Sequence, residues 1–130
     1  MGKIIICTGQ ENAYDKKVNN YANTLINDNT EVLINPEKEL LHQKMLYDMT
    51  FENANKFIEK DIDAVIITYS DHVFNAVRVA VKNHNKEDCE IHTVMNDGTI
   101  TVAHILPNGR LDAWIEGVFD VWDKALLELI

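Results

Sequence analysis

The sequence lacks the features that mark membrane, disulfide-bonded and nucleic-acid-binding proteins. No apolar run approaches the roughly 20 residues that cross a bilayer, and the run at residues 4–7 is too short for a signal peptide. The two cysteines, Cys7 and Cys89, lack C-x-x-C spacing, which favours two reduced, buried thiols. The net charge of −9 opposes contact with a nucleic-acid backbone. We therefore expect a cytoplasmic protein that binds no membrane and no nucleic acid, and whose partner is another protein.

The motifs of common catalytic sites are missing too. The loop after the first apolar run reads CTGQENAYDKK, with one glycine and no Lys-Ser or Lys-Thr pair. It is neither a G-x-x-x-x-G-K-S/T phosphate loop nor a G-x-G-x-x-G dinucleotide loop. The five histidines form no H-x-x-x-H pair, and the only serine, Ser70, lies outside any G-x-S-x-G motif. We predict no metal, no cofactor and no catalytic residue.

Short apolar runs alternate with amphipathic stretches in the first two thirds of the chain. Strands are predicted at residues 3–7, 31–34 and 63–68, because these runs are short, apolar and rich in β-branched residues. Helices are predicted at residues 11–27, from Pro36 to about Lys60, and after Ser70-Asp71, which can cap a helix. Such a βαβαβα order predicts a mostly parallel sheet with helices on both faces.

The pattern changes after Asn85. Strand-like runs at residues 89–95 and 99–106 flank Asn-Asp-Gly, a hairpin turn signal, and Pro-Asn-Gly at residues 107–109 predicts a second turn. An apolar stripe then predicts a C-terminal helix over residues 115–130. The length fits one domain, residues 1–130. The predicted fold is α/β, a short mostly parallel sheet followed by a β-hairpin and a C-terminal helix.

Open α/β sheets bind ligands at the carboxyl ends of their parallel strands. The residues predicted to lie there are Thr8, Gly9, Gln10, Asn35, Glu37, Thr68, Tyr69, Ser70, Asp71 and His72. Several of them also have a simple structural explanation. The loop after the first strand is an ordinary polar turn, Ser70 and Asp71 cap a helix, and Glu37 is a first-turn carboxylate that faces a favourable helix dipole.

Four stretches carry a resemblance to a known family. They read INPEKEL at residues 34–40, ITYSDH at 67–72, PNGRL at 107–111 and WIEGVFD at 114–120. In this order and spacing they resemble the C-terminal half of bacterial OLD-like, ABC-type ATPases, which has E-N-P-E-x-H-L-H-P, E-T-H-S-D-H, D-E-x-G-R and W-P-E-G-F-F-D. The resemblance covers roughly residues 31–130, and the first thirty residues match no family.

The chain departs from the family pattern at residues that take part in ATP hydrolysis in that family. Ile34 stands where the family has an acid that holds Mg²⁺, Ile67 replaces a second acid, and Tyr69 replaces the histidine that senses the γ-phosphate; only Glu37, which polarises the attacking water, remains. The resemblance implies a degenerate ATPase half without catalysis, a protein-binding module that binds or inhibits a related ATPase or its partner, for example as a phage anti-defence protein. Two alternatives stay open. One is a small-molecule or nucleotide-processing enzyme with its site at the strand ends, and the other is a structural homodimer.

Overall fold

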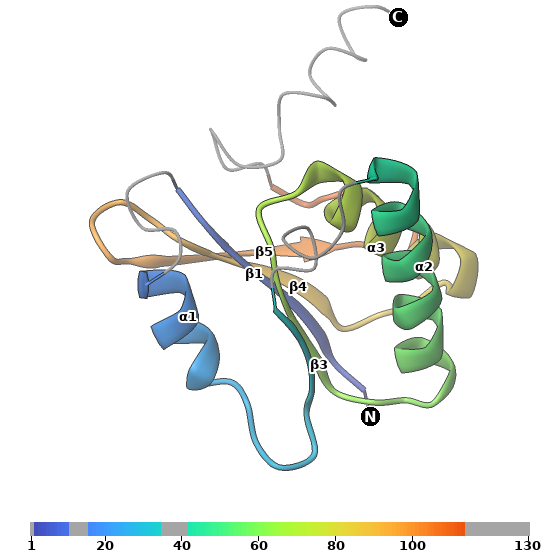
Figure 1. The fold of residues 1–130 in the computed structure, drawn as a ribbon, viewed down its shortest axis with the longest axis horizontal. Helices are drawn as coiled ribbons and strands as arrows, with labels where there is room; N and C mark the ends of the chain where they lie inside the picture. The colour runs from blue at the N-terminus through green and yellow to red at the C-terminus, as the bar shows by residue number, and fades with distance from the viewer. Residues whose placement is uncertain (1, 11–15, 35–41, 114–130) are drawn as a thin grey trace, which may run out of the picture.

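The computed structural model describes residues 2–10, 16–34 and 42–113. Short apolar runs form its strands, and amphipathic stretches form the helices between them (Figure 1). The elements are β1 (Ile4–Gly9), α1 (Lys16–Asn23), β2 (Glu31–Ile34), α2 (Gln43–Glu59), β3 (Ala64–Ile67), α3 (Asp71–His84), β4 (Cys89–Val94) and β5 (Ile100–Ile105).

The five strands form one sheet in the order β2-β3-β1-β4-β5. Strands β2, β3, β1 and β4 are parallel, and β5 pairs antiparallel with β4. Helix α1 lies on one face of the sheet, and α2 and α3 lie on the other (Figure 1). The predicted fold class is therefore confirmed.

Strand β1 shows how one run of apolar residues serves both faces. Ile4 and Ile6 are fully buried against the layer of α2 and α3, whereas Cys7 is buried in the cluster under α1. Fully burying a side chain such as isoleucine stabilises a fold by about 1.5–3 kcal/mol. A strand buried on both faces therefore holds the two layers together from the centre of the sheet.

Two predicted helices have different bounds in the structure. The helix predicted at residues 11–27 ends at Asn23, because the N–H groups of Thr24 and Leu25 bond to carbonyls three residues back and the chain turns away. The helix predicted from Pro36 begins only at Gln43 in the described residues, since His42 is extended with φ −100 and ψ 120. The predicted C-terminal helix at 115–130 lies outside the described residues.

The other predicted elements agree closely with the structure. Ser70 caps α3, and the buried side of that helix carries the expected small apolar residues. Both predicted turns contain a glycine in the left-handed region, with φ 90 at Gly98 and φ 84 at Gly109. Of the helices in the described residues, none has the length and apolar character needed to cross a membrane.

Candidate functional site

The carboxyl ends of β1 and β3 lie where open α/β sheets commonly bind ligands. These strands are neighbours, yet the chain leaves β1 toward α1 on one face and leaves β3 toward α3 on the other. At such a switch point the two connections separate, and open α/β sheets bind ligands there. The end of β1, the loops that follow β1 and β3, and the first turn of α3 together contain eight of the ten site residues predicted from the sequence.

The residues after β1 connect the edge of the sheet to the β4–β5 hairpin. Thr8 is 1 % exposed, and the N–H of Gln10 donates to the carbonyl of Val94 at 3.0 Å. The Gln10 side-chain Oε1 accepts from the N–H of Asn96 at 2.9 Å. Gln10 therefore holds the hairpin turn beside the end of β1, which explains its polar character in structural terms.

The residues after β3 form a capped helix start. Thr68 is fully buried, its N–H donates to the carbonyl of Cys7 at 3.1 Å, and its Oγ1 accepts from the N–H of Ser70 at 3.0 Å. Ser70 Oγ then accepts from the N–H groups of His72 at 3.2 Å and Val73 at 3.5 Å. Asp71 occupies the first turn of α3, where a carboxylate faces the favourable end of the helix dipole.

Four threonines form a row across the sheet at this end. Thr8 is in register with Thr93, Thr93 is in register with Thr101, and Thr68 lies one residue beyond the Cys7–Ile67 pair, next to Thr8. Their alternation with core residues places them on the face of α2 and α3. Within the described part of the chain, the buried Oγ1 of Thr93 has no hydrogen-bond partner. In this part of the chain, the Thr93 hydroxyl thus keeps hydrogen-bonding capacity that the fold does not use.

Two apolar side chains are exposed at the same end of the sheet. Ile34 ends β2 with 58 % of its surface exposed, and Tyr69 follows β3 with 53 % exposed. Because β2 and β3 are neighbours and Ile34 is in register with Ile67, both residues belong to adjacent strand ends. Asn35 and Glu37, which were also predicted as site residues, lie outside the described residues.

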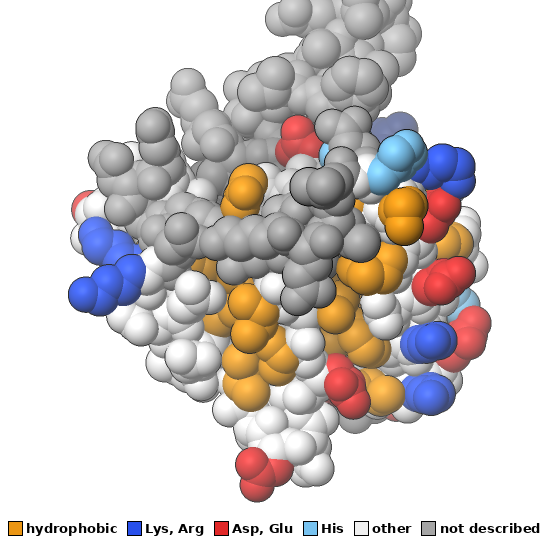
Figure 2. Space-filling model, viewed as in Figure 1, with side chains coloured by type: hydrophobic (Ala, Val, Ile, Leu, Met, Phe, Trp, Pro, Cys, Tyr) orange, Lys and Arg blue, Asp and Glu red, His pale blue; other side chains and the backbone are white. Residues whose placement is uncertain are grey.

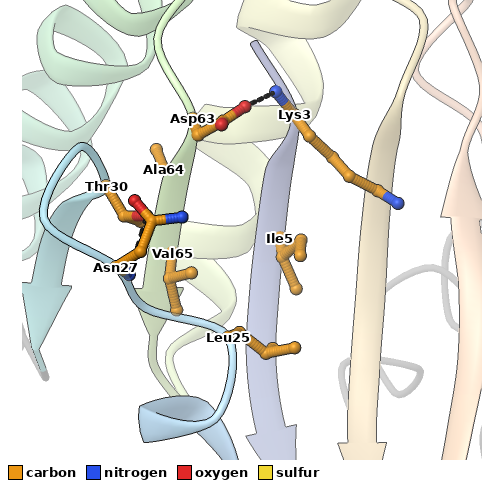
Figure 3. Close-up of a pocket in the computed structure, with 8 residues that line it drawn as sticks. All are labelled: Lys3, Ile5, Leu25, Asn27, Thr30, Asp63, Ala64 and Val65. Atoms are coloured by element: carbon orange, nitrogen blue, oxygen red, sulfur yellow. Dashed lines mark hydrogen bonds between the residues drawn. The ribbon is translucent and has the colours of Figure 1, made fainter.

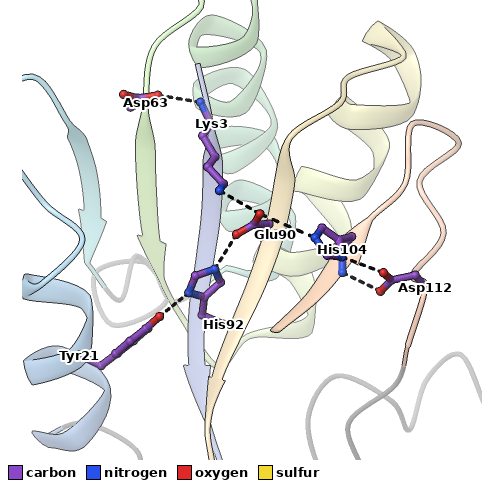
Figure 4. A network of polar contacts seen from close by, with 7 residues as sticks. All are labelled: Lys3, Tyr21, Asp63, Glu90, His92, His104 and Asp112. Atoms are coloured by element: carbon purple, nitrogen blue, oxygen red, sulfur yellow. Dashed lines mark hydrogen bonds and ion pairs between the residues drawn. The ribbon is translucent and has the colours of Figure 1, made fainter. Parts of the chain in front are cut away.

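A polar network on the α1 face was missed by the sequence reasoning (Figure 4). The Tyr21 hydroxyl lies 2.6 Å from Nδ1 of His92, and Nε2 of His92 lies 2.8 Å from Oε1 of Glu90. The other Glu90 oxygen pairs with Lys3 Nζ at 2.9 Å. Oε2 of Glu90 also lies 3.7 Å from Nε2 of His104. The network therefore joins α1, β4 and β5 with Lys3, the residue before β1.

The chemistry of Glu90 fixes the proton positions in this network. Partial burial opposes ionisation of Glu90, but hydrogen bonds from His92 and Lys3 outweigh it and hold the Glu90 pKa below its usual range. Because an ionised carboxylate only accepts, Nε2 of His92 carries a hydrogen, and in the neutral ring Nδ1 then accepts from the Tyr21 hydroxyl. Burial raises the pKa of the Tyr21 phenol, which keeps it protonated and able to donate.

The network ends at the last described turn. Nδ1 of His104 lies 2.8 Å from Oδ2 of Asp112, and the backbone N–H of His104 donates to Oδ1 of the same carboxylate at 2.7 Å. These bonds, the backbone one first, lower the pKa of Asp112. No group of three or more His, Cys, Asp or Glu in the described ranges is arranged to hold a metal ion. We therefore interpret the network as a polar link between elements.

A small cavity lies on the same face, at the amino ends of the strands (Figure 3). It has a volume of about 290 Å³, with apolar walls from Ile5, Leu25 and Val65. The Asp63 carboxylate at its rim accepts from the N–H of Lys3 at 2.8 Å. This volume is just below the roughly 300–1,000 Å³ typical of ligand pockets. The cavity is at the opposite end of the sheet from the predicted site.

A period-two signal in the sequence could have revealed the network. Glu90 and His92 alternate with the buried Cys89, Ile91 and Thr93, so they share the opposite face of β4. Helical or metal-type spacing of histidines does not reveal partners that lie on neighbouring strands. Comparison with known proteins gives no further guide, since no protein-family model, no curated protein and no solved structure matches the chain.

Proposed function

We propose that this chain is a non-catalytic protein-binding module that docks onto a related OLD-like, ABC-type ATPase, or onto a partner of that ATPase, through the carboxyl edge of its sheet. One observation carries the proposal. At two positions where the resemblance implies phosphoryl-transfer groups, the chain has Ile34 and Tyr69, and both side chains are more than half exposed on adjacent strand ends.

Phosphoryl transfer depends on charged groups that position the phosphate and stabilise its charge, and an isoleucine and a tyrosine supply neither. Exposed isoleucine and tyrosine side chains instead lower the free energy when a partner removes them from water, and tyrosine is enriched among residues that dominate binding energy. The edge is therefore suited to contact with a protein. A phage-borne inhibitor of a defence ATPase is one protein of this kind.

The test is a binding and inhibition experiment with a purified ATPase of the OLD-like class. Calorimetry measures the Kd, and phosphate release by the ATPase is followed with and without the chain. We expect Tyr69→Asp to weaken binding at least tenfold, because a carboxylate would have to be desolvated at the contact. Val79→Asp is the matched control, since Val79 is an exposed apolar residue on α3 at 38 % exposure. Equal losses for the two variants would contradict docking at the carboxyl edge.

A second measurement addresses the non-catalytic part of the proposal. Calorimetry with Mg²⁺-ATP on the chain alone should give no binding at millimolar nucleotide. The proposal would be overturned if the chain binds Mg²⁺-ATP and releases phosphate, and if Glu37→Gln abolishes that release. The chain would then be an active ATPase.

A small-molecule enzyme with its site at the strand ends is the second candidate, and the threonine row favours it. An unpaired buried hydroxyl such as that of Thr93 costs about 1–3 kcal/mol, which a ligand hydrogen bond would recover. Thr93→Val is expected to raise the Tm of the free protein and to abolish any Tm increase caused by a bound small molecule. A ligand-induced Tm increase that survives Thr93→Val would place the ligand elsewhere.

A further inference from the structure

In the part of the chain that the structure describes, the outer edge of β2 has open hydrogen-bonding groups. The N–H of Glu31 donates to the carbonyl of Asp63 at 2.9 Å, so Glu31 and Leu33 direct their backbone groups toward β3. Because alternate residues of a strand face opposite neighbours, the N–H and C=O groups of Val32 and Ile34 point away from the sheet. None of the described strands pairs with them, since β2 is the first strand in the sheet order.

The opposite edge of the sheet is partly covered by the chain itself. Leu111 forms a bridge with Ile105, and the N–H of Leu106 donates to the carbonyl of Arg110 at 2.7 Å. Asp112 bonds to both the N–H and the C=O of His104, whose backbone groups face outward. The second half of β5 is therefore capped by the segment that follows it. Within the described residues, β2 has no equivalent cap.

Apart from its short length of four residues, strand β2 lacks the usual protection of an edge strand. Natural edges carry lysine, proline, glycine bulges or inward charges that block pairing with another chain. The sequence of β2 is Glu-Val-Leu-Ile, with its single charge at the first position. Val32 and Ile34 share the α1 face, and Ile34 is 58 % exposed. Hydrophobic side chains gather at the centre of the visible face, over the region of β2 and β3 (Figure 2).

We propose that β2 pairs antiparallel with β2 of a second copy of this chain, about a two-fold axis at Leu33, and joins the two sheets into one. In this register Val32 lies opposite Ile34 of the partner subunit, and Ile34 lies opposite Val32 of the partner subunit. Both residues direct their N–H and C=O groups outward, so these two pairs form the hydrogen-bonded pairs of an antiparallel ladder. The edge is self-complementary, and a two-fold interface of this kind closes after two copies.

The charges of the strand permit this register. The two Glu31 carboxylates end four residue steps apart along the strands, roughly 13 Å at about 3.3 Å per residue. This separation exceeds the Debye length of about 8 Å at physiological ionic strength, so their repulsion is largely screened. The net charge of −9 on each chain still opposes association, and the dimer should therefore tighten as salt is added. Ile34 belongs to both this edge and the docking surface proposed above, whereas Tyr69 takes no part in the pairing, so a change at Tyr69 tests the docking surface alone.

Sedimentation velocity of the full chain, from micromolar to millimolar concentration, is the first test. We expect twice the single-chain mass of 14.9 kDa at the upper end. Val32→Pro removes only an outward N–H, a substitution that edge strands tolerate, and Ile34→Lys places a charge in the ladder. Both should weaken the dimer at least tenfold. Val102→Lys is the matched control, a similar change at a 45 % exposed residue on β5, and it should leave the dimer intact.

Amide hydrogen exchange identifies the strand that pairs. The amides of Val32 and Ile34 should exchange more slowly as concentration rises, whereas the Leu33 amide, bonded to β3, should be protected at every concentration. Protection of Leu33 in Val32→Pro also shows that this variant still folds. A monomer at millimolar concentration, a dimer unchanged by Val32→Pro, or an open-ended polymer would each overturn the proposal. Tyr69→Asp should leave the dimer intact, which separates this interface from the docking of an ATPase.

Discussion

Removing one hydroxyl from the polar network tests how α1 is attached to the sheet. Tyr21→Phe deletes the donor that lies 2.6 Å from Nδ1 of His92, a residue only 7 % exposed. A typical intramolecular hydrogen bond contributes about 0.5–1.5 kcal/mol, and a buried acceptor left without a partner costs about 1–3 kcal/mol. Because part of the Tyr21 side chain is exposed, water can partly replace the lost hydroxyl as a hydrogen-bond donor to His92. We therefore expect a loss of about 1–2 kcal/mol in the free energy of unfolding.

Urea unfolding followed by circular dichroism measures this loss, and a thermal scan should show a Tm lower by roughly 3–8 °C for a domain of this size. Tyr47→Phe on α2 is the control. It makes the same chemical change at a tyrosine that stacks on Phe51, with no hydrogen bond to its hydroxyl in the described residues. If Tyr21→Phe costs no more than Tyr47→Phe, the Tyr21–His92 contact does not hold α1 in place.

Three further predictions concern charge, capping and the thiols. The lowered pKa values of Glu90 and Asp112 stabilise the fold above the unfolded-state values, about 4.3 and 3.9, and this contribution is lost as the pH falls through the folded-state values. Glu90→Gln should make the free energy of unfolding fall less steeply as the pH is lowered, as measured by urea unfolding at a series of acid pH values. An unchanged pH dependence would contradict the lowered pKa of Glu90. Ser70→Ala should destabilise the protein by about 1 kcal/mol in the same assay, whereas Ser70→Asp should keep most of the cap; equal losses would exclude a capping role. Burial raises the pKa of Cys7 and Cys89 to about 12, so a disulfide-exchange reagent should label neither thiol rapidly in native buffer, and fast labelling would refute their burial.

Local signals in the sequence were sufficient for most of the fold. The β-branched run at 31–34 predicted β2 with its observed bounds, and Ser70 predicted the start of α3 because a serine side chain satisfies free helix N–H groups. Helix ends were less predictable. The stripe through Leu25 continues the pattern of α1, but Leu25 packs against the smaller core cluster from beyond the helix end. Periodicity cannot distinguish these two ways of burying an apolar residue.

The candidate site was predictable only in part, for a related reason. Strand ends can be read from the sequence, so Thr8 and Thr68 were expected near each other. The order of strands in the sheet is a tertiary property, and it decides that Thr93 and Thr101 extend the same row. The same order places His104 near Glu90. Contacts between neighbouring strands depend on the strand order and register, and these cannot be read from the local patterns of a single sequence.

The uneven covering of the two sheet faces has a consequence for how the native protein opens. In the described residues helix α1 has eight residues, with no acidic residue in its first turn and no basic residue in its last turn, so these residues gain little from the helix dipole. A helix this short persists only through its packing on the sheet. Its layer should therefore detach in brief fluctuations while α2 and α3 stay in place. Cys7 lies under α1 and Cys89 lies on the opposite face. The two thiols thus act as separate reporters of the two layers, and Cys7 should become reactive first.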